Sequence, residues 1–193
     1  FQRISLQRSH GEAALVLDLQ AGQPRLRKLR QQGSAKIMLP RVTGDLPEAV
    51  LLNTSGGLTG GDRLDFALHL GAGLRLCATT QTAERAYASD GRAAHVKIAA
   101  HLAPQADLAW LPQETILFEN SVLARDTTVH LAHDARLLMA ETVVLGRHAM
   151  GETPRHARLT DRRRILRDGR PVWAETTRID AGYLSEAETP ALL

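Results

Sequence analysis

The strongest constraint on the fold is an alternation of polar and apolar residues with a period of two. It is almost perfect over residues 63–70 and resumes over residues 74–78, after a Gly-Ala-Gly stretch at 71–73. Successive side chains of a β-strand point to opposite faces, so this period predicts strands with one buried and one exposed face. We predict that these two strands form a hairpin that turns at residues 71–73.

Further segments carry the same signal along the chain, and a Gly-rich or Pro-containing turn separates most of them. They are residues 13–19, 49–53, 95–99, 122–131, 136–145, 157–166 and 171–178. Asp168-Gly169 is a strong turn signal between the last two. A helix is suggested only at residues 80–88, where Thr80 could serve as the N-cap.

Many short strands with few helices predict an all-β fold, either β-helix-like (a solenoid) or an irregular β-sandwich. The sequence shows no clean repeat period, which argues against a regular solenoid. No linker divides the chain, so we expect one domain over residues 1–193.

Composition excludes several classes of protein. The chain has 193 residues and a net charge of +3, and its basic clusters lack the interleaved aromatic residues that nucleic-acid binding usually shows. Its apolar runs are far shorter than the ~20 residues of a membrane helix, so we expect no membrane partner. With Cys77 as its one cysteine and no visible signal peptide, we expect a reducing, cytoplasmic location.

The most informative segment is a glycine-rich loop that contains Gly56, Gly57, Thr59, Gly60 and Gly61 and ends at Asp62. Two Gly-Gly pairs indicate backbone at positive φ or a close approach to the main chain. A phosphate-binding loop would need Lys-Ser/Thr after its last glycine, whereas an acid follows here. Asp62 is therefore either a functional carboxylate or a residue that only caps the turn.

Four segments in order resemble the UreD (UreH) family of urease accessory proteins. They are residues 51–62 (LLNTSGGLTGGD), 79–87 (TTQTAERAY), 110–118 (WLPQETILF) and 145–152 (LGRHAMGE). Ser55 replaces an expected alanine, which is a small-for-small change. The chain is shorter than a usual member, so we expect that the C-terminal part of the domain is missing, and residues 185–193 do not continue a strand.

The resemblance implies a largely β, β-helix-like protein without catalytic activity of its own. It implies the partners UreF-type accessory protein, UreG-type GTPase and apo-urease. Nickel would pass transiently through an internal tunnel to apo-urease, and no cofactor would be bound permanently.

Within that framework we predict a nickel path formed by Asp62, Glu141 and Glu175, because Ni²⁺ accepts carboxylate ligands. Glu141 lies in an apolar run, so it is either solvent-facing or needs a buried partner. Residues Thr80, Glu84 and Arg85 are candidates for the tunnel lining, although ordinary strand or ion-pair roles are open for them. A transfer path should bind the metal weakly at several points.

Two other functions compete with the conduit. A β-solenoid carbohydrate hydrolase would use paired carboxylates such as Asp62 and Glu141 as acid and base, but the chain has only two Trp and two Tyr to form sugar platforms. A nickel-storing metallochaperone would need a His- or Cys-rich tract, and His130 and His133 would lie on opposite faces of a strand. Two facing carboxylates in an open groove would favour the enzyme, and acids along an enclosed channel would favour the conduit.

Overall fold

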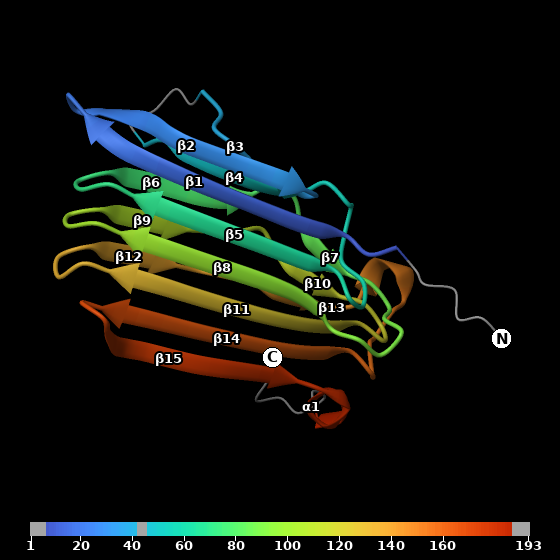
Figure 1. Ribbon diagram of the computed structural model, residues 1–193. Helices are drawn as coiled ribbons and strands as arrows, with labels where there is room; N and C mark the ends of the chain where they lie inside the picture. Colours follow the sequence, from blue (N-terminus) through green and yellow to red (C-terminus); the bar gives the residue numbers. More distant parts are fainter. Residues whose placement is uncertain (1–6, 42–45, 187–193) are drawn as a thin grey trace.

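The computed structural model describes residues 7–41 and 46–186. Fifteen strands in this part of the chain form three sheets (Figure 1). The first sheet has, in spatial order, β2 (Gln23–Gly33), β1 (His10–Gln20), β5 (Arg63–Leu70), β8 (Ala94–Leu102), β11 (Val122–Leu131), β14 (Arg158–Arg167) and β15 (Arg170–Ile179). The second has β3 (Ala35–Met38), β4 (Glu48–Asn53), β6 (Arg75–Thr80), β9 (Asp107–Trp110) and β12 (Arg136–Met139). The third has β7 (Glu84–Ala86), β10 (Thr115–Leu117) and β13 (Val143–Leu145).

Three consecutive coils visit the sheets in the same order: β5–β6–β7, β8–β9–β10 and β11–β12–β13. Equivalent strands of successive coils pair in parallel. The predicted all-β class is confirmed, and of the two predicted architectures the chain adopts the β-helix-like one. The coils differ in length, since the paired residues Phe66, Ile98, Thr127 and Arg163 are 32, 29 and 36 residues apart. This irregularity explains why the sequence shows no clean repeat although the backbone coils.

The predicted hairpin at residues 71–73 is wrong. Strand β5 pairs in parallel with β1 and β8, whereas β6 pairs in parallel with β4 and β9 in a different sheet. The turn between them, with Gly73 at φ +69°, is therefore a corner of the solenoid. Two alternating segments joined by a short glycine turn look alike in sequence whether they pair with each other or with neighbouring coils.

The predicted helix at residues 80–88 is also wrong, because tertiary pairing overrides the local helix signal. Thr80 ends β6, and β7 pairs in parallel with β10. The Asp168-Gly169 turn is confirmed: both residues have positive φ and join β14 to β15 in an antiparallel hairpin. The predicted strand at 136–145 is divided into β12 and β13, which belong to two sheets.

The interior changes character along the solenoid. Leu15, Leu64, Leu68 and Ala100, from the strands of the N-terminal half, are buried in an apolar core. From β10 onward, five polar or charged side chains are buried as well: Thr115, Ser121, Arg125, Thr127 and Asp161. The C-terminal coils therefore contain a polar interior region beside buried apolar residues such as Leu123 and Leu159.

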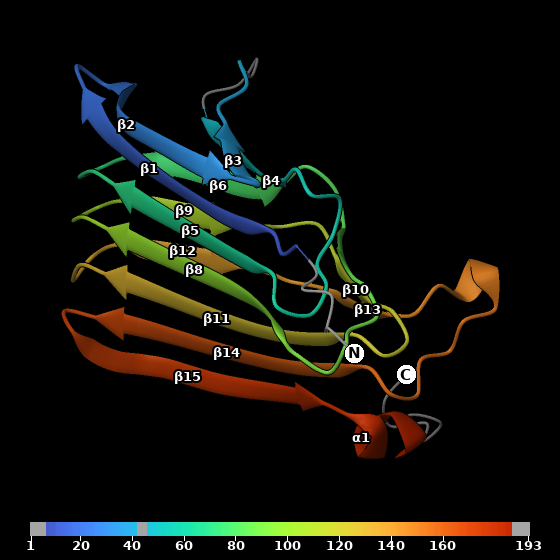
Figure 2. The same ribbon diagram turned by 45° about the vertical axis from the view of Figure 1, so that its right-hand side comes forward.

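The two ends of the solenoid differ. At the N-terminal end, β3 pairs antiparallel with β4 and packs against β1 and β2. At the other end, the second sheet stops at β12 while the first sheet continues with β14 and β15 (Figure 2). A 3-10 turn (His148–Met150) and helix α1 (Ala181–Glu186) complete the described structure. No helix in it has the length and apolar character to cross a membrane.

Candidate functional site

The glycine-rich loop lies closely against strand β7 and the link that follows it. A Cβ atom on Gly57 (φ +150°) would stand 2.3 Å from Tyr87 Cε2, and one on Gly60 would stand 2.2 Å from Ser89 Oγ. Thr59 Oγ1 donates a hydrogen bond to the carbonyl of Ala88 at 2.8 Å. These two glycines are therefore required for close packing of the loop against the next coil.

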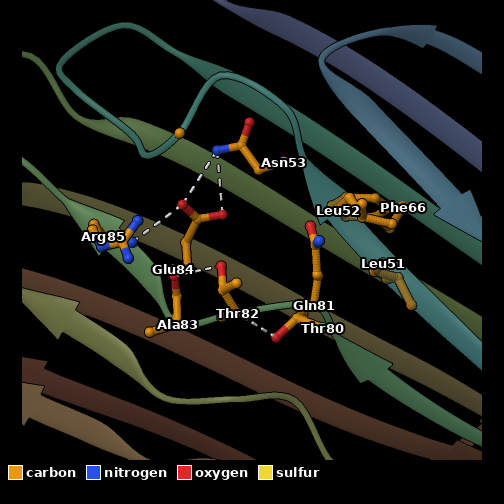
Figure 3. Close-up of a pocket in the computed structure, with 11 residues that line it drawn as sticks. Leu51, Leu52, Asn53, Phe66, Thr80, Gln81, Thr82, Ala83, Glu84 and Arg85 are labelled. Carbon is orange, nitrogen blue, oxygen red and sulfur yellow. Dashed lines mark hydrogen bonds between the residues drawn. The ribbon is translucent and has the colours of Figure 1, made fainter.

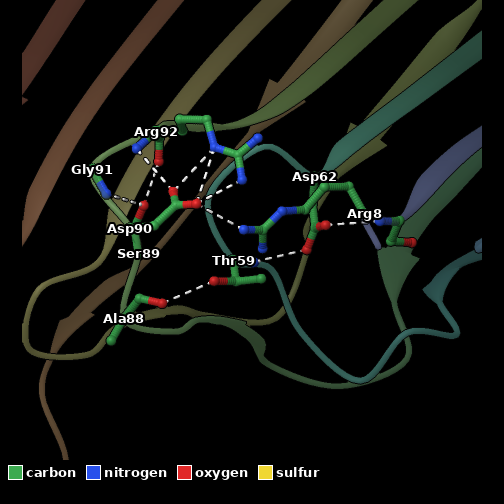
Figure 4. A network of polar contacts seen from close by, with 9 residues as sticks. Arg8, Thr59, Asp62, Ala88, Ser89, Asp90, Gly91 and Arg92 are labelled. Atoms are coloured by element: carbon green, nitrogen blue, oxygen red, sulfur yellow. Dashed lines mark hydrogen bonds and ion pairs between the residues drawn. The ribbon is translucent and has the colours of Figure 1, made fainter. Parts of the chain in front are cut away.

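Asp62 closes this loop and is buried, with 5% of its surface exposed. Its Oδ1 accepts a 2.8 Å hydrogen bond from the backbone N–H of Ser9, and its Oδ2 accepts one of 2.8 Å from the N–H of Thr59 (Figure 4). Both oxygens thus join the segment before β1 to the loop. The structure gives Asp62 a capping role, and its contribution to a nickel path stays a prediction.

Glu84 lies in a small cavity of about 60 Å³ where β4 ends and β7 begins (Figure 3). The three residues predicted as tunnel lining, Thr80, Glu84 and Arg85, all line it. Asn53 Nδ2 donates to both Glu84 carboxylate oxygens, at 3.2 and 3.3 Å. Burial raises the pKa of Glu84 to about 7, against the lowering effect of the Asn53 hydrogen bond. The cavity has room for a few water molecules around a carboxyl that titrates near neutral pH.

Glu141 follows strand β12 and points into the polar interior, with only 2% of its side chain exposed. It forms ion pairs with Arg125 Nη1 at 3.3 Å and Arg163 Nε at 2.8 Å. Trp110 Nε1 donates a hydrogen bond to Glu141 Oε1 at 3.1 Å. Of the two alternatives that the sequence left open, the structure shows the buried and paired carboxylate.

Asp161 completes this network by accepting two hydrogen bonds from Arg125, from Nε at 3.0 Å and from Nη2 at 2.6 Å. Two carboxylates and two guanidinium groups, those of Arg125, Arg163, Glu141 and Asp161, thus balance each other inside the solenoid. Mutual pairing of this kind is what allows charges to remain buried.

Glu175 of β15 lies at the outer edge of the same network, 3.6 Å from Arg163 Nη1 and with 44% of its side chain exposed. It borders a groove of about 550 Å³ between β12 and the β14–β15 hairpin. The groove is lined by the charged residues Glu141, Arg163 and Glu175 and by apolar side chains. Those apolar residues are Leu137, Met139, Ala140, Ile165 and Trp173.

The predicted nickel-path residues therefore fall into two places. Arg163 brings Glu141 and Glu175 together, whereas Asp62 contacts Ser9 and Thr59 near the glycine-rich loop. In the described part of the chain, the side chains of Asp62 and Glu141 share no hydrogen-bond or ion-pair partner. The pair of facing carboxylates in an open groove that a hydrolase would need is not what these two residues form.

Sequence reasoning missed Arg125, Asp161 and Asn53. A signal was present for Arg125, because it shares the alternation phase of the buried residues Leu123 and Val129 on β11. A charge in the buried phase of a strand requires a partner. Asn53 carried no such signal, since its contact with Glu84 joins residues 31 apart in sequence.

Within the described residues, no three His, Cys, Asp or Glu side chains converge in a way that could hold a metal ion. The buried carboxylates Glu141 and Asp161 are both paired with Arg125. The described residues therefore do not form a closed tetrahedral or octahedral metal site.

Comparison with known proteins identifies the family. Residues 9–193 match the family profile described as UreD urease accessory protein. Relatives named urease accessory protein UreD are 56% identical over 182 residues in Cereibacter sphaeroides (strain ATCC 17029), 51% over 188 in Chelativorans sp. (strain BNC1) and 46% over 190 in Paracoccus denitrificans. These matches cover 94%, 97% and 98% of this chain and 66%, 68% and 67% of the relatives, so the chain spans about two thirds of their length. The chain belongs to the UreD family of urease accessory proteins.

Proposed function

We propose that this chain acts in urease maturation, as a scaffold through which nickel passes to apo-urease. Support for a maturation role comes from the family, whose members are named urease accessory proteins. Its partners would be the UreF-type accessory protein, the UreG-type GTPase and apo-urease. The glycine-rich loop leads into strand β5 and ends in an acid, so GTP hydrolysis is assigned to the UreG-type partner.

The observation that carries the conduit is the polar interior of the C-terminal coil. An apolar solenoid core would stabilise the fold more simply, because burial of charges costs free energy that pairing only offsets. The chain nevertheless places Arg125, Glu141, Asp161 and Arg163 inside, next to a groove that Glu175 borders. The groove reaches Glu141 and Arg163 of this network, and a groove of about 550 Å³ has room for a hydrated cation.

The same contacts predict weak binding, which a transfer path requires. A cation that approaches Glu141 must displace Arg125 or Arg163, both within 3.3 Å of its carboxylate. At Glu84 a proton competes with the metal near neutral pH, since the pKa of that carboxyl is about 7. Neither carboxylate would therefore retain nickel.

The test is urease activation at limiting nickel in cells that carry the full set of accessory proteins, with this protein as Glu175→Gln. Glu175 has one long ion pair and is half exposed, so the substitution should leave the fold intact. Glu12→Gln, on the exposed outer face of β1, is the matched control. We expect a several-fold loss of urease activity for Glu175→Gln alone, with unchanged co-purification of the partners and recovery in excess nickel.

Glu84→Gln and Asp62→Asn extend the same experiment to the cavity and the loop. If Glu84→Gln and Glu175→Gln both leave activation at the level of Glu12→Gln, the conduit is wrong and only a scaffold role is left. If Asp62→Asn lowers activity only together with loss of the complex, Asp62 is a structural cap and does not contact nickel.

A further inference from the structure

The two ends of the solenoid are built from the same element, a β-hairpin of the first sheet. Strands β1 and β2 are joined by Ala21-Gly22 with φ of 50° and 73°, and β14 and β15 are joined by Asp168-Gly169 with φ of 48° and 76°. Both are two-residue turns with positive φ at each position. The ends therefore present comparable hairpins, and what lies beneath each hairpin can be compared.

Beneath the N-terminal hairpin lies β3, a strand of four residues. The chain turns back after β2, and β3 pairs antiparallel with β4 at the edge of the second sheet. Its side chains Ala35 and Ile37 are fully buried against the hairpin. This short strand closes the N-terminal end of the solenoid.

Beneath the C-terminal hairpin, the position that corresponds to β3 holds no strand of the described chain, and the groove of about 550 Å³ lies there. Strand β12 takes the place of β4, with its outer edge unpaired. The N–H of Arg136 donates to Ala106 and that of Ala140 donates to Trp110, both on the side of β9. In a parallel ladder, the backbone N–H and C=O groups of successive residues point alternately to the strands on either side. Leu137 and Met139 therefore direct their N–H and C=O groups away from β9, to the free edge.

The groove walls match an extended peptide with alternating character. Trp173, 41% exposed, pairs with Ile165 on the inner face of the hairpin. With Leu137 and Met139 it gives the groove an apolar floor. Glu175 and Glu141 outnumber the single Arg163 among its charged side chains, and Glu175 is the more exposed of the two acids. A segment with apolar residues at alternate positions and a Lys or Arg opposite Glu175 would complement this surface.

We propose that this groove binds an extended polypeptide segment as a sixth strand of the second sheet, antiparallel to β12, as β3 is to β4. The occupant is a segment from the third of the UreD polypeptide that lies outside the match with this chain. Matches cover 94% and 91% of this chain but only 66% and 64% of the two Cereibacter sphaeroides relatives, so those proteins contain ample sequence for a strand as short as β3. The added strand enlarges the buried core and forms an outer wall of the groove beside Glu141 and Glu175.

The experiment uses this chain and overlapping peptides of about 12 residues that together cover the unmatched part of the Cereibacter sphaeroides relative. Binding is followed by Trp173 fluorescence and by hydrogen exchange resolved to single amides. We expect one peptide to slow exchange of the Leu137 and Met139 amides at least tenfold. The amides of Arg136 and Ala140, which are already bonded, should change little.

A matched pair of variants tests whether the groove is the binding surface. Trp173→Ser removes an apolar group from the groove, whereas Val172→Ser changes its exposed neighbour, which does not line the groove. Both side chains are partly exposed, so both variants should fold. Hydrogen exchange of the Leu137 and Met139 amides measures binding in both variants, because Trp173→Ser removes the fluorescent probe. We expect at least tenfold weaker peptide binding for Trp173→Ser and unchanged binding for Val172→Ser.

The proposal is overturned if no peptide protects Leu137 and Met139, if protection appears on another strand, or if the two variants weaken binding equally. Self-association of the chain with the same protection pattern and no peptide bound would show that a second copy occupies the groove, which also overturns it. The assay contains no nickel and no urease. Its failure therefore leaves the conduit untouched, and failure of the conduit leaves this surface untouched.

Discussion

The N-terminal and C-terminal coils of this solenoid share one backbone plan but enclose different interiors. The position of the buried Leu64 continues in register through Val96 to Arg125 and Asp161 in the later coils. The level of Leu68, in contrast, stays apolar at Ala100 and Val129. Apolar coils gain stability from area removed from water, and polar coils depend on complete pairing of their charges. The difference separates coils that are stabilised by apolar burial alone from coils whose stability also depends on charge pairing.

The largest effect is expected for Arg125→Met. Arg125 is buried and holds both Asp161 and Glu141, so its loss leaves two carboxylates without this cation. Breaking a buried ion pair from one side typically destabilises a protein by about 3–5 kcal/mol. Urea unfolding followed by circular dichroism measures this change.

The pH dependence of the same variant sharpens the comparison. Without Arg125, Glu141 and Asp161 share the one positive charge of Arg163, which leaves one buried negative charge in excess. The destabilisation should therefore shrink as the pH is lowered toward 5. The unsubstituted chain under the same conditions is the control. A loss of stability that is the same at pH 8 and pH 5 would mean that lost packing, and not unpaired charge, causes the effect.

The corresponding test in the apolar half is Leu68→Ala. Leu68 is fully buried, and removal of its side chain leaves a cavity in a close-packed core. We expect a destabilisation of about 3 kcal/mol, within the range of Leu→Ala changes in cores. Urea unfolding at pH 8 and pH 5 should give the same difference in unfolding free energy between the variant and the unsubstituted chain. A strong pH dependence of this difference would contradict an uncharged core in this half.

Glu84→Gln is expected to raise the free energy of unfolding, unlike Arg125→Met and Leu68→Ala. Because burial raises the pKa of Glu84 from 4.5 to about 7, the folded chain binds this proton more tightly than the unfolded chain. Stability contributed by the protonated form is present below pH 4.5 and is lost as the pH rises to 7. The glutamine cannot ionise, so the variant should be more stable than the parent by about 2 kcal/mol at pH 8 and equal to it at pH 4.

Thermal melts across this pH range measure the difference, and Glu12→Gln on the exposed face is the control because no buried carboxyl changes there. A variant that is destabilised at pH 8 would show that the ionised Glu84 and its contact with Asn53 stabilise the fold.

The sequence predicted the fold class and most strands because alternation is a local property. It did not predict which strands pair, as the incorrect hairpin at residues 71–73 shows, since pairing in a solenoid joins residues about 30 positions apart. The helix predicted at residues 80–88 failed for the same reason: the segment pairs with the next coil through β7 and β10. Local sequence preference therefore determined neither the strand pairing around residues 71–73 nor the conformation of residues 80–88.

For the site, the sequence indicated carboxylates in unusual positions but not their partners. Glu141 was recognisable because it interrupts an apolar run, whereas Arg125, 16 residues earlier and on another sheet, holds its carboxylate. Asp62 was singled out by the glycine-rich loop, and the structure shows that both of its oxygens accept backbone N–H groups. A motif identifies an important residue, but only the contacts indicate what it does.

The smallest effect is expected on the outer face, where one row of side chains crosses both halves of the molecule. His69, His101 and His130 of β5, β8 and β11 stack with ring centroids 4.7 and 4.5 Å apart and ring planes within 4° of each other. Burial, together with the neighbouring rings of His130 and His69, lowers the pKa of His101. The folded chain therefore binds a proton at His101 less readily than the unfolded chain. The stability that neutral His101 contributes is present above pH 6.5 and decreases as the pH falls below it.

His101→Asn should reduce the loss of stability between pH 7.5 and pH 5.5, measured as the shift of the urea midpoint. The control is His95→Asn, which changes an exposed residue of the same strand. An equal shift in both variants would show that the stack does not resist protonation, and that the two halves of the solenoid differ in their interiors alone.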